Sequence, residues 1–221
     1  VGANGQIGME FGARAAPDGY TLTAGQGGSM VVMPHTYKKL SYDPLRDYTL
    51  ITVSTTNFLG MVVHPSVPFK SARDLINFAR ANPGRISFGS NGEGAFTHLA
   101  VESLRLMSGF TYTHVPYKGS AQLTTDLLGG HIDAAMAGIT GLTPMIRAGK
   151  LRLLAISTLK RQAAFEGVPT IAETVPGYES GGWFGYVAPA GTPRDIVNLL
   201  NAEINRAMSL PDVKEIGRAH V

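Results

Sequence analysis

The chain has 221 residues, of which 44% are hydrophobic, so it can bury the core of one large domain or of two small lobes. Its formal net charge is only +3 and no run of basic residues occurs, which argues against a nucleic-acid or membrane-surface role. No apolar stretch approaches the roughly 18 residues needed to span a bilayer, and the absence of cysteine excludes disulfides, a thiol nucleophile and a Cys-based zinc site.

Both ends of the chain have unusual sequences. It begins without methionine and carries three glycines at Gly2, Gly5 and Gly8, a pattern that raises the question of a phosphate-binding loop. A phosphate-binding loop of this kind follows a strand, and no strand pattern precedes these glycines. The last six residues, IGRAHV at 216–221, are predicted to be a non-native tail and are left out of the fold prediction.

Short β-branched or apolar runs alternate with helical patterns along the chain. Strands are predicted at 20–24, 50–54, 59–64, 86–90, 112–117, 132–138, 151–157 and 184–188. Several of these runs are apolar on both faces, like a central strand that is covered by helices on each side. The alternation predicts an α/β fold.

Four longer helices have recognisable ends. Their predicted N-caps are Ser71, Thr97, Ser120 and Thr192. Glycine or Pro-Gly follows the first three helices. A shorter helix is also predicted, and its Pro144 is expected to lie near its first turn, where proline is tolerated. The last helix is expected to bury a stripe formed by Ile196, Leu199, Leu200 and Ile204.

The middle of the chain holds four strand–helix units. We expect residues 65–182 to form a second lobe, inserted into a first lobe that comprises 1–64 and 183–215. Two lobes joined by two crossings of the chain make a hinge and a cleft, and small ligands bind in such clefts.

The clearest local motif is a strand, a glycine loop and a helix in the sequence ISFGSNGEGAFTHLAVESL. Ser90, Asn91, Gly92 and Gly94 lie in this loop just before the helix. Glycines allow backbone N–H groups to converge, and the helix dipole adds partial positive charge, so the loop favours an anion. The P-loop lysine and the G-x-G-x-x-G spacing are both absent. The alternative is a tight turn that binds nothing.

Two further loops follow predicted strands. In VPYKGSAQL, the phenol of Tyr117 and the hydroxyl of Ser120 are expected to orient a carboxylate, while Lys118 either adds charge or is a solvated surface lysine. In GQGGSMVVMP, Ser29 and neighbouring N–H groups follow the strand at 20–24. Open α/β sheets bind ligands at the carboxyl ends of their strands. Three such loops on one side are expected to enclose a small acid.

The sequence leaves the roles of two single residues undecided, and it contains no recognisable set of catalytic residues. His98 either contacts a ligand or packs and caps its helix, and Trp183 either lines the cleft or fills the hinge core. Neither G-x-S-x-G nor H-E-x-x-H occurs, and the six histidines have no spacing suited to a metal. We therefore expect binding without chemistry, with no metal and no cofactor.

The chain resembles the Bug family, the periplasmic solute-binding proteins of tripartite tricarboxylate transporters. The resemblance covers nearly all of residues 2–215. It rests on APDGYTL, YKKLSYDPLRDYT, VHPSVPFKSARDLINFARANPGRISFGSNGEGAFTHLA, HVPYKGSAQLTTDLLGGHID, IRAGKLRLLAIST, VPTIAE and WFGYVAPAGTPRDIVNLLNAEI.

The resemblance implies a two-lobed, type II-like Venus-flytrap fold that captures a small organic acid and delivers it to membrane permease subunits. The expected ligand is a di- or tricarboxylate or an aromatic acid, and the expected protein is a periplasmic monomer. It also implies that a signal peptide, the first β–α unit of the first lobe and its carboxylate-gripping loop lie upstream of Val1. The opening glycines would then flank a wall of the first-lobe pocket.

The family's binding positions carry over residue by residue. They are Gly28, Ser29, Met30, Ser90, Asn91, Gly92, Glu93, Gly94, Ala95, Thr97, His98, Tyr117, Lys118, Gly119 and Ser120, to which we add Gly138 and Trp183. Ala95 stands where family members often carry serine, and Ala137-Gly138 replace a frequent Asp-Asn pair. These departures favour a bulkier or more apolar acid.

Two alternatives remain open at this point. A sensor module that docks on a histidine kinase would have the same pocket, and neighbouring genes would separate the two functions. A nucleotide-dependent α/β enzyme would show turnover or tight NAD or ATP binding.

Overall fold

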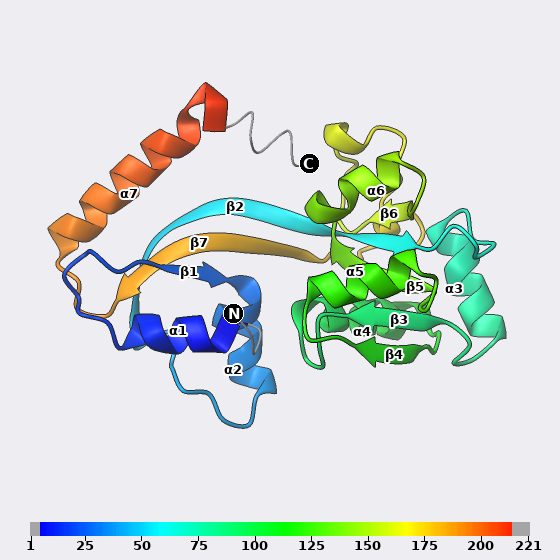
Figure 1. Cartoon of the computed structure of the whole chain (residues 1–221), viewed down its shortest axis with the longest axis horizontal. Coiled ribbons are helices and arrows are strands. Elements are labelled where there is room, and N and C mark those ends of the chain that lie inside the picture. The colour runs from blue at the N-terminus through cyan, green and yellow to red at the C-terminus, as the bar shows by residue number, and fades with distance from the viewer. Residues whose placement is uncertain (1–4, 214–221) are drawn as a thin grey trace. The chain divides into compact units, whose positions relative to one another are not determined.

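A computed structural model describes residues 5–213, which form two compact units (Figure 1). Unit 1 contains residues 5–57 and 182–213, and unit 2 contains 58–181. The chain enters unit 2 within strand β2 (Tyr48–Val63) and leaves it at the start of β7 (Gly181–Pro189). Gly2 and the expected tail at 216–221 lie outside the described residues, and the expected lobe boundaries stay a prediction.

Unit 2 contains a mixed sheet whose central strands are parallel. Its elements are α3 (Ala72–Ala81), β3 (Ser87–Ser90), α4 (Phe96–Ser108), β4 (Thr113–Pro116), α5 (Ser120–Leu128), β5 (Ala134–Gly138), η3 (Thr140–Leu142), α6 (Thr143–Arg147), β6 (Arg152–Ile156), η4 (Ala163–Phe165) and η5 (Ile171–Glu173). Strand β3 lies between β4 and β5 and is parallel to both, while β2 pairs antiparallel with β5 and β6 (Figure 1). The carboxyl ends of β3, β4 and β5 therefore lie at one edge of the sheet.

Helices cover both faces of this sheet, as the apolar strand sequences predict. On one face, Phe88 of β3 and Met136 of β5 pack with Leu75 of α3 and Leu104 of α4. On the other face, Ala135 and Ala137 of β5 pack with Leu123 and Leu127 of α5. Neighbouring residues of β5 thus point to opposite faces, as strand geometry requires. The predicted α/β fold is confirmed.

Unit 1 is built around antiparallel strands, several short helices and one helix of 16 residues. Its elements are α1 (Gln6–Ala13), β1 (Thr23–Gln26), the π-helix η2 (Gly28–Val32), α2 (Met33–Thr36), the first part of β2, β7 and α7 (Arg194–Ser209). Strand β1 pairs antiparallel with β7. Met9, Met30, Tyr42, Tyr48 and Val187 form the buried core.

The structure corrects two strand predictions. The runs at 50–54 and 59–64 form one continuous strand, β2, because the β-branched threonines of the intervening sequence TTN keep the backbone extended. The strand expected at 20–24 begins instead at Thr23, while Tyr20 lies outside it and is 93% exposed.

Helix α7 also differs from its prediction. Its N-cap is Pro193, and the Thr192 hydroxyl donates to the Pro189 carbonyl (2.8 Å) instead of capping the helix. None of its residues is buried, and Leu199 is 62% exposed. An apolar stripe in a sequence indicates which face of a helix can be covered, but not whether another element covers it.

The N-cap of α3 is confirmed and gives a first testable expectation. The Asp74 N–H donates to the Ser71 hydroxyl (3.1 Å). Replacing Ser71 by alanine removes this acceptor and is expected to lower the free energy of unfolding by about 1 kcal/mol. Urea denaturation would measure the loss. Carboxylate affinity is expected to be unchanged, because this cap lies at the start of α3, away from the loops after β3 and β4.

Candidate functional site

Two loops of unit 2 that carry most of the expected binding residues lie side by side. Ser90 at the end of β3 is in register with Pro116 at the end of the parallel strand β4. Helix α4 begins a few residues after β3, and α5 begins a few residues after β4. The Tyr117 N–H donates to the Ser90 carbonyl (2.9 Å), so a backbone hydrogen bond joins the two loops.

The N-termini of α4 and α5 have no side-chain cap. The N-cap of α4 is Ala95 and that of α5 is Gly119, and neither makes a side-chain capping bond. The predicted caps Thr97 and Ser120 are therefore wrong. The first-turn N–H groups of a helix have no partner within the helix, and without a cap they are open to an anion. Two such sets of donors lie at one sheet edge.

The glycine loop between β3 and α4 is held in shape by its own side chains. The Thr97 hydroxyl accepts from the Asn91 N–H (3.0 Å) instead of capping the helix. The Ser90 hydroxyl donates to the Gly92 carbonyl (3.0 Å) and accepts from the Gly92 N–H (3.2 Å). The loop also needs left-handed backbone at Gly92 (φ 131°) and Gly94 (φ 68°). Its conformation is thus set before any ligand arrives.

The other expected residues of unit 2 lie around these two loops. Glu93, Lys118 and Ser120 are exposed, and Ala95 is buried. Gly138 is exposed and ends β5, which is parallel to β3, so it lies at the same sheet edge.

The Tyr117 side chain is held by contacts within unit 2. Its hydroxyl donates to an Asp126 carboxylate oxygen of α5 (2.8 Å), and its ring is buried in the core below the loop. Burial, followed by this hydrogen bond, raises the pKa of Tyr117 to about 12. The phenol therefore anchors the loop to α5, and its expected role in orienting a carboxylate stays a prediction. The sequence offered one signal of this contact, which was the carboxylate of Asp126 nine residues further along the chain.

His98 is paired with a histidine that sequence reasoning missed. Its imidazole stacks on that of His114 in β4, with ring centroids 3.8 Å apart and an interplanar angle of 0°. The His98 Nδ1 accepts from the Gly94 N–H (3.0 Å), so His98 packs against the loop and fixes it. The His114 Nε2 lies 2.7 Å from the Ser90 hydroxyl. Burial, and next the neighbouring His98, lower the pKa of His114.

At Gly28, Ser29 and Met30 of unit 1, the side chain is either absent or buried. Ser29 is buried, and its hydroxyl donates to the Gln26 carbonyl (3.2 Å). Met30 lies in the core. A side chain at Gly28 would meet open space, so the backbone of η2 is accessible there. Trp183 packs against this core, close to Gly27.

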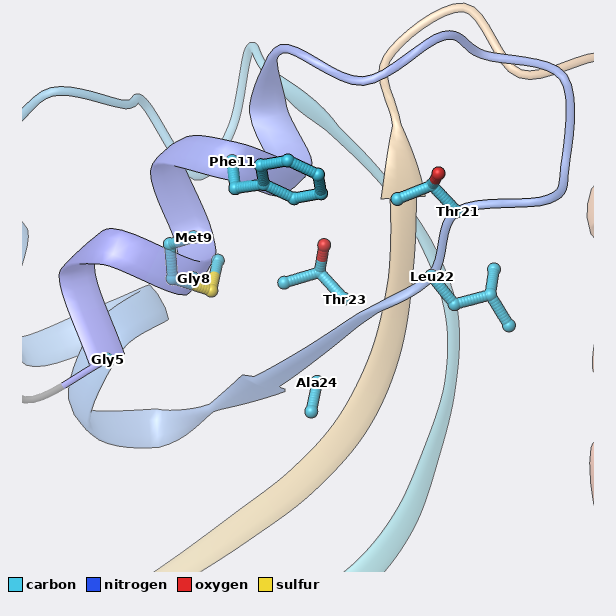
Figure 2. Close-up of a pocket in the computed structure, with 8 residues that line it drawn as sticks. All are labelled: Gly5, Gly8, Met9, Phe11, Thr21, Leu22, Thr23 and Ala24. Carbon is cyan, nitrogen blue, oxygen red and sulfur yellow. The ribbon is translucent and has the colours of Figure 1, made fainter. Parts of the chain in front are cut away.

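Gly5 and Gly8 do not form a phosphate loop. Gly5 is the N-cap of α1, and Gly8 lies inside this helix. Beside them is a cavity of about 380 Å³ between α1 and the segment at 21–24 (Figure 2). It is lined by Gly5, Gly8, Met9, Phe11, Thr21, Leu22, Thr23 and Ala24. Among the described residues, the hydroxyls of Thr21 and Thr23 are its only polar side-chain groups, and none of these lining residues is charged.

Within residues 5–213, no three His, Asp or Glu side chains are grouped as metal ligands. None of the described helices has both the length and the apolar character needed to cross a membrane.

Comparisons with known proteins place the chain among transporter receptors. The family model described as "Tripartite tricarboxylate transporter family receptor" matches residues 1–219. A UPF0065 protein in the tcbD–tcbE intergenic region of Pseudomonas sp. strain P51 is 38% identical over 97% of the chain, and BugT of Bordetella pertussis is 35% identical over 97%. The chain spans 64% of the length of the first relative and 67% of the second.

Solved structures agree with this placement. Rpa4515 from R. palustris with adipate superposes with a TM-score of 0.90 at 34% identity and covers 98% of this chain and 73% of its own. MatC from Rhodopseudomonas palustris with bound malate superposes with a TM-score of 0.86 at 29% identity and covers 96% of this chain and 73% of its own. The predicted fold class, that of two-lobed periplasmic binding proteins, is confirmed.

Proposed function

The chain belongs to the tripartite tricarboxylate transporter receptor family, which includes BugT, and from this premise we propose that it binds a small carboxylate-containing acid. The ligand carboxylate is held at the carboxyl edge of β3 and β4 by the first-turn N–H groups of α4 and α5. The observation that carries this proposal is that neither helix has a side-chain cap. At α3, by contrast, Ser71 supplies one.

Two groups of neutral donors suit a carboxylate. Each helix N-terminus carries partial positive charge, and its N–H groups point along the helix axis toward an incoming anion. Lys118, beside the N-terminus of α5, adds a full positive charge that is free to move in solvent. The adipate and malate named in the two neighbouring structures support a dicarboxylate as the ligand class.

The backbone of residues 28–30 is proposed as the contribution of unit 1 to binding. The binding function without catalysis, the periplasmic location and the delivery of the acid to permease subunits are proposals that follow from the family. The lobe assignment, 1–64 and 183–215 against 65–182, is likewise carried as a proposal.

A panel of organic acids tests the binding proposal. Thermal unfolding of the chain is measured with adipate, malate, citrate and an aromatic acid, each at millimolar concentration. An acid that binds the folded state alone stabilises it by RT ln(1 + [L]/Kd), which is about 2.7 kcal/mol at a hundredfold excess over Kd. We expect at least one acid to raise the melting temperature in proportion to ln[L]. A panel without any shift contradicts the proposal.

A further inference from the structure

The hydrogen bond between Gly94 and His98 fixes the protonation state of the histidine. A backbone N–H can only donate, so the His98 Nδ1 that receives it (3.0 Å) must carry a lone pair. The imidazole is therefore neutral, with its proton on Nε2. The glycine loop in its observed form contains one acceptor that disappears when His98 is protonated.

The second imidazole lies directly against the first. The rings of His98 and His114 stack face to face, so two charged rings would repel each other across 3.8 Å. His114 also lies 2.7 Å from the hydroxyl of Ser90, which holds the other end of the loop. The stack thus connects both loop anchors to one pair of imidazoles.

Two acidic groups act on this pair. Glu93 of the loop and Glu102 of α4 act on His114, and Glu102 also interacts with His98. Glu102 accepts hydrogen bonds from Arg105 (3.0 Å) and from the Tyr112 hydroxyl (2.7 Å). Burial alone would raise the pKa of Glu102, but these two bonds lower it. Glu102 therefore stays ionised in the pH range in which a histidine side chain changes charge.

We propose that His98 is a positioning residue that holds the glycine loop in its anion-binding form only while its imidazole is neutral, so that acid weakens carboxylate binding. Protonation turns Nδ1 into a donor that faces the Gly94 N–H. The two donors repel each other, and the loop must leave the conformation that presents the α4 N-terminus. The proposal rests on the proposed binding site, and it adds a dependence on pH.

The added positive charge on the pair attracts a carboxylate and so acts against this effect. We expect the loss of loop geometry to be the larger of the two effects. The loss of loop geometry acts on N–H groups that contact the ligand directly. The net result is weaker binding at acid pH.

Two variants of His98 separate the loss of its hydrogen-bond acceptor from the gain of a proton. In His98→Asn, the side-chain oxygen can take the place of Nδ1 and accept from Gly94 without titrating. In His98→Leu the acceptor is lost at every pH. Adipate affinity is measured by calorimetry at about pH 7.5 and about pH 5.5, the range in which histidine changes charge. The protonation of adipate itself is common to all the proteins and cancels in the comparison.

We expect the wild-type chain to lose about tenfold more affinity than His98→Asn over this range, which corresponds to the loss of one hydrogen bond. His98→Leu is expected to be weak at both pH values, and its melting curve shows whether it is folded. Equal losses in the wild type and His98→Asn, or stronger wild-type binding in acid, overturn the proposal.

A measurement without ligand keeps the test independent of the binding function. The Gly94 amide resonance is followed by 1H–15N NMR as a function of pH. It is expected to move with the His98 ring titration in the wild type and to stay in place in His98→Asn. If no acid binds but Gly94 follows His98, the proposed function fails while the proton-dependent loop stands. A Gly94 amide resonance that does not change with pH as the His98 ring is protonated refutes the loop mechanism.

Discussion

Replacement of both Gly92 and Gly94 by valine is expected to abolish carboxylate binding while the helices of unit 2 remain folded. Both glycines have positive φ, 131° and 68°, in which a β-branched side chain is strained by about 1–3 kcal/mol each. The loop relieves this strain by changing its conformation, and with it the hydrogen bonds that Gly92 and Gly94 donate. We expect affinity to fall by more than a hundredfold.

Matched glycines provide the control for this variant. Gly84 (φ 73°) and Gly109 (φ 66°) also have left-handed backbone, and a side chain at either would meet open space. They precede β3 and follow α4, so both lie away from the carboxyl edge of the sheet. The double variant Gly84→Val with Gly109→Val is expected to lose stability and keep its affinity. Circular dichroism measures helix content, and calorimetry measures binding. Normal binding by the Gly92/Gly94 variant would show that the site is elsewhere.

Replacement of Gly119 by aspartate is expected to lower carboxylate affinity by about a hundredfold without destabilising the protein. Gly119 is the uncapped N-cap of α5; its φ of 162° is extended, and a side chain there would meet open space. Aspartate at this position caps the helix and is about as favourable as glycine, within a few tenths of a kcal/mol. It also takes the free N–H groups and adds a negative charge close to the ligand, which costs several kcal/mol at a separation of about 4 Å in a partly buried site.

Two control variants show which effect dominates. Gly119→Asn caps the same N–H groups without a charge, so it is expected to lose less affinity than Gly119→Asp. Ser71→Asp places the same charge at the N-terminus of α3, which already has a cap, and is expected to leave affinity unchanged. Urea denaturation is run on all three proteins. Affinity close to wild type in Gly119→Asp would contradict a role of the α5 N-terminus in binding.

The sequence predicts the order of elements well and the ends of helices less well. The strand and helix of ISFGSNGEGAFTHLAVESL are found where they were expected, because apolar periodicity and glycine punctuation both mark them. The predicted cap Thr97 lies two residues after the observed N-cap, Ala95, and the predicted cap Ser120 lies one residue after Gly119. A serine or threonine near a helix start is usually its cap, but here the Thr97 hydroxyl accepts from Asn91 instead.

The candidate site, too, could be predicted from the sequence only in part. Its loops could be predicted, because strand–glycine–helix junctions at the carboxyl ends of parallel strands are local in the sequence. The partners of its side chains could not. His114 is 16 residues from His98, and only the parallel pairing of β3 and β4 brings the two rings together. The burial of Ser29 and the bond from Tyr117 to Asp126 likewise depend on tertiary packing.

The central claim is that a carboxylate binds the uncapped N-termini of α4 and α5. The most direct measurement follows backbone amide resonances by 1H–15N NMR while an acid of the panel that binds is titrated into the protein. We expect the largest shifts at the first-turn amides of the two helices, Phe96 to His98 and Ser120 to Gln122, with little change at the capped start of α3. Shifts that leave these amides in place and gather in the cavity beside α1 would contradict the claim.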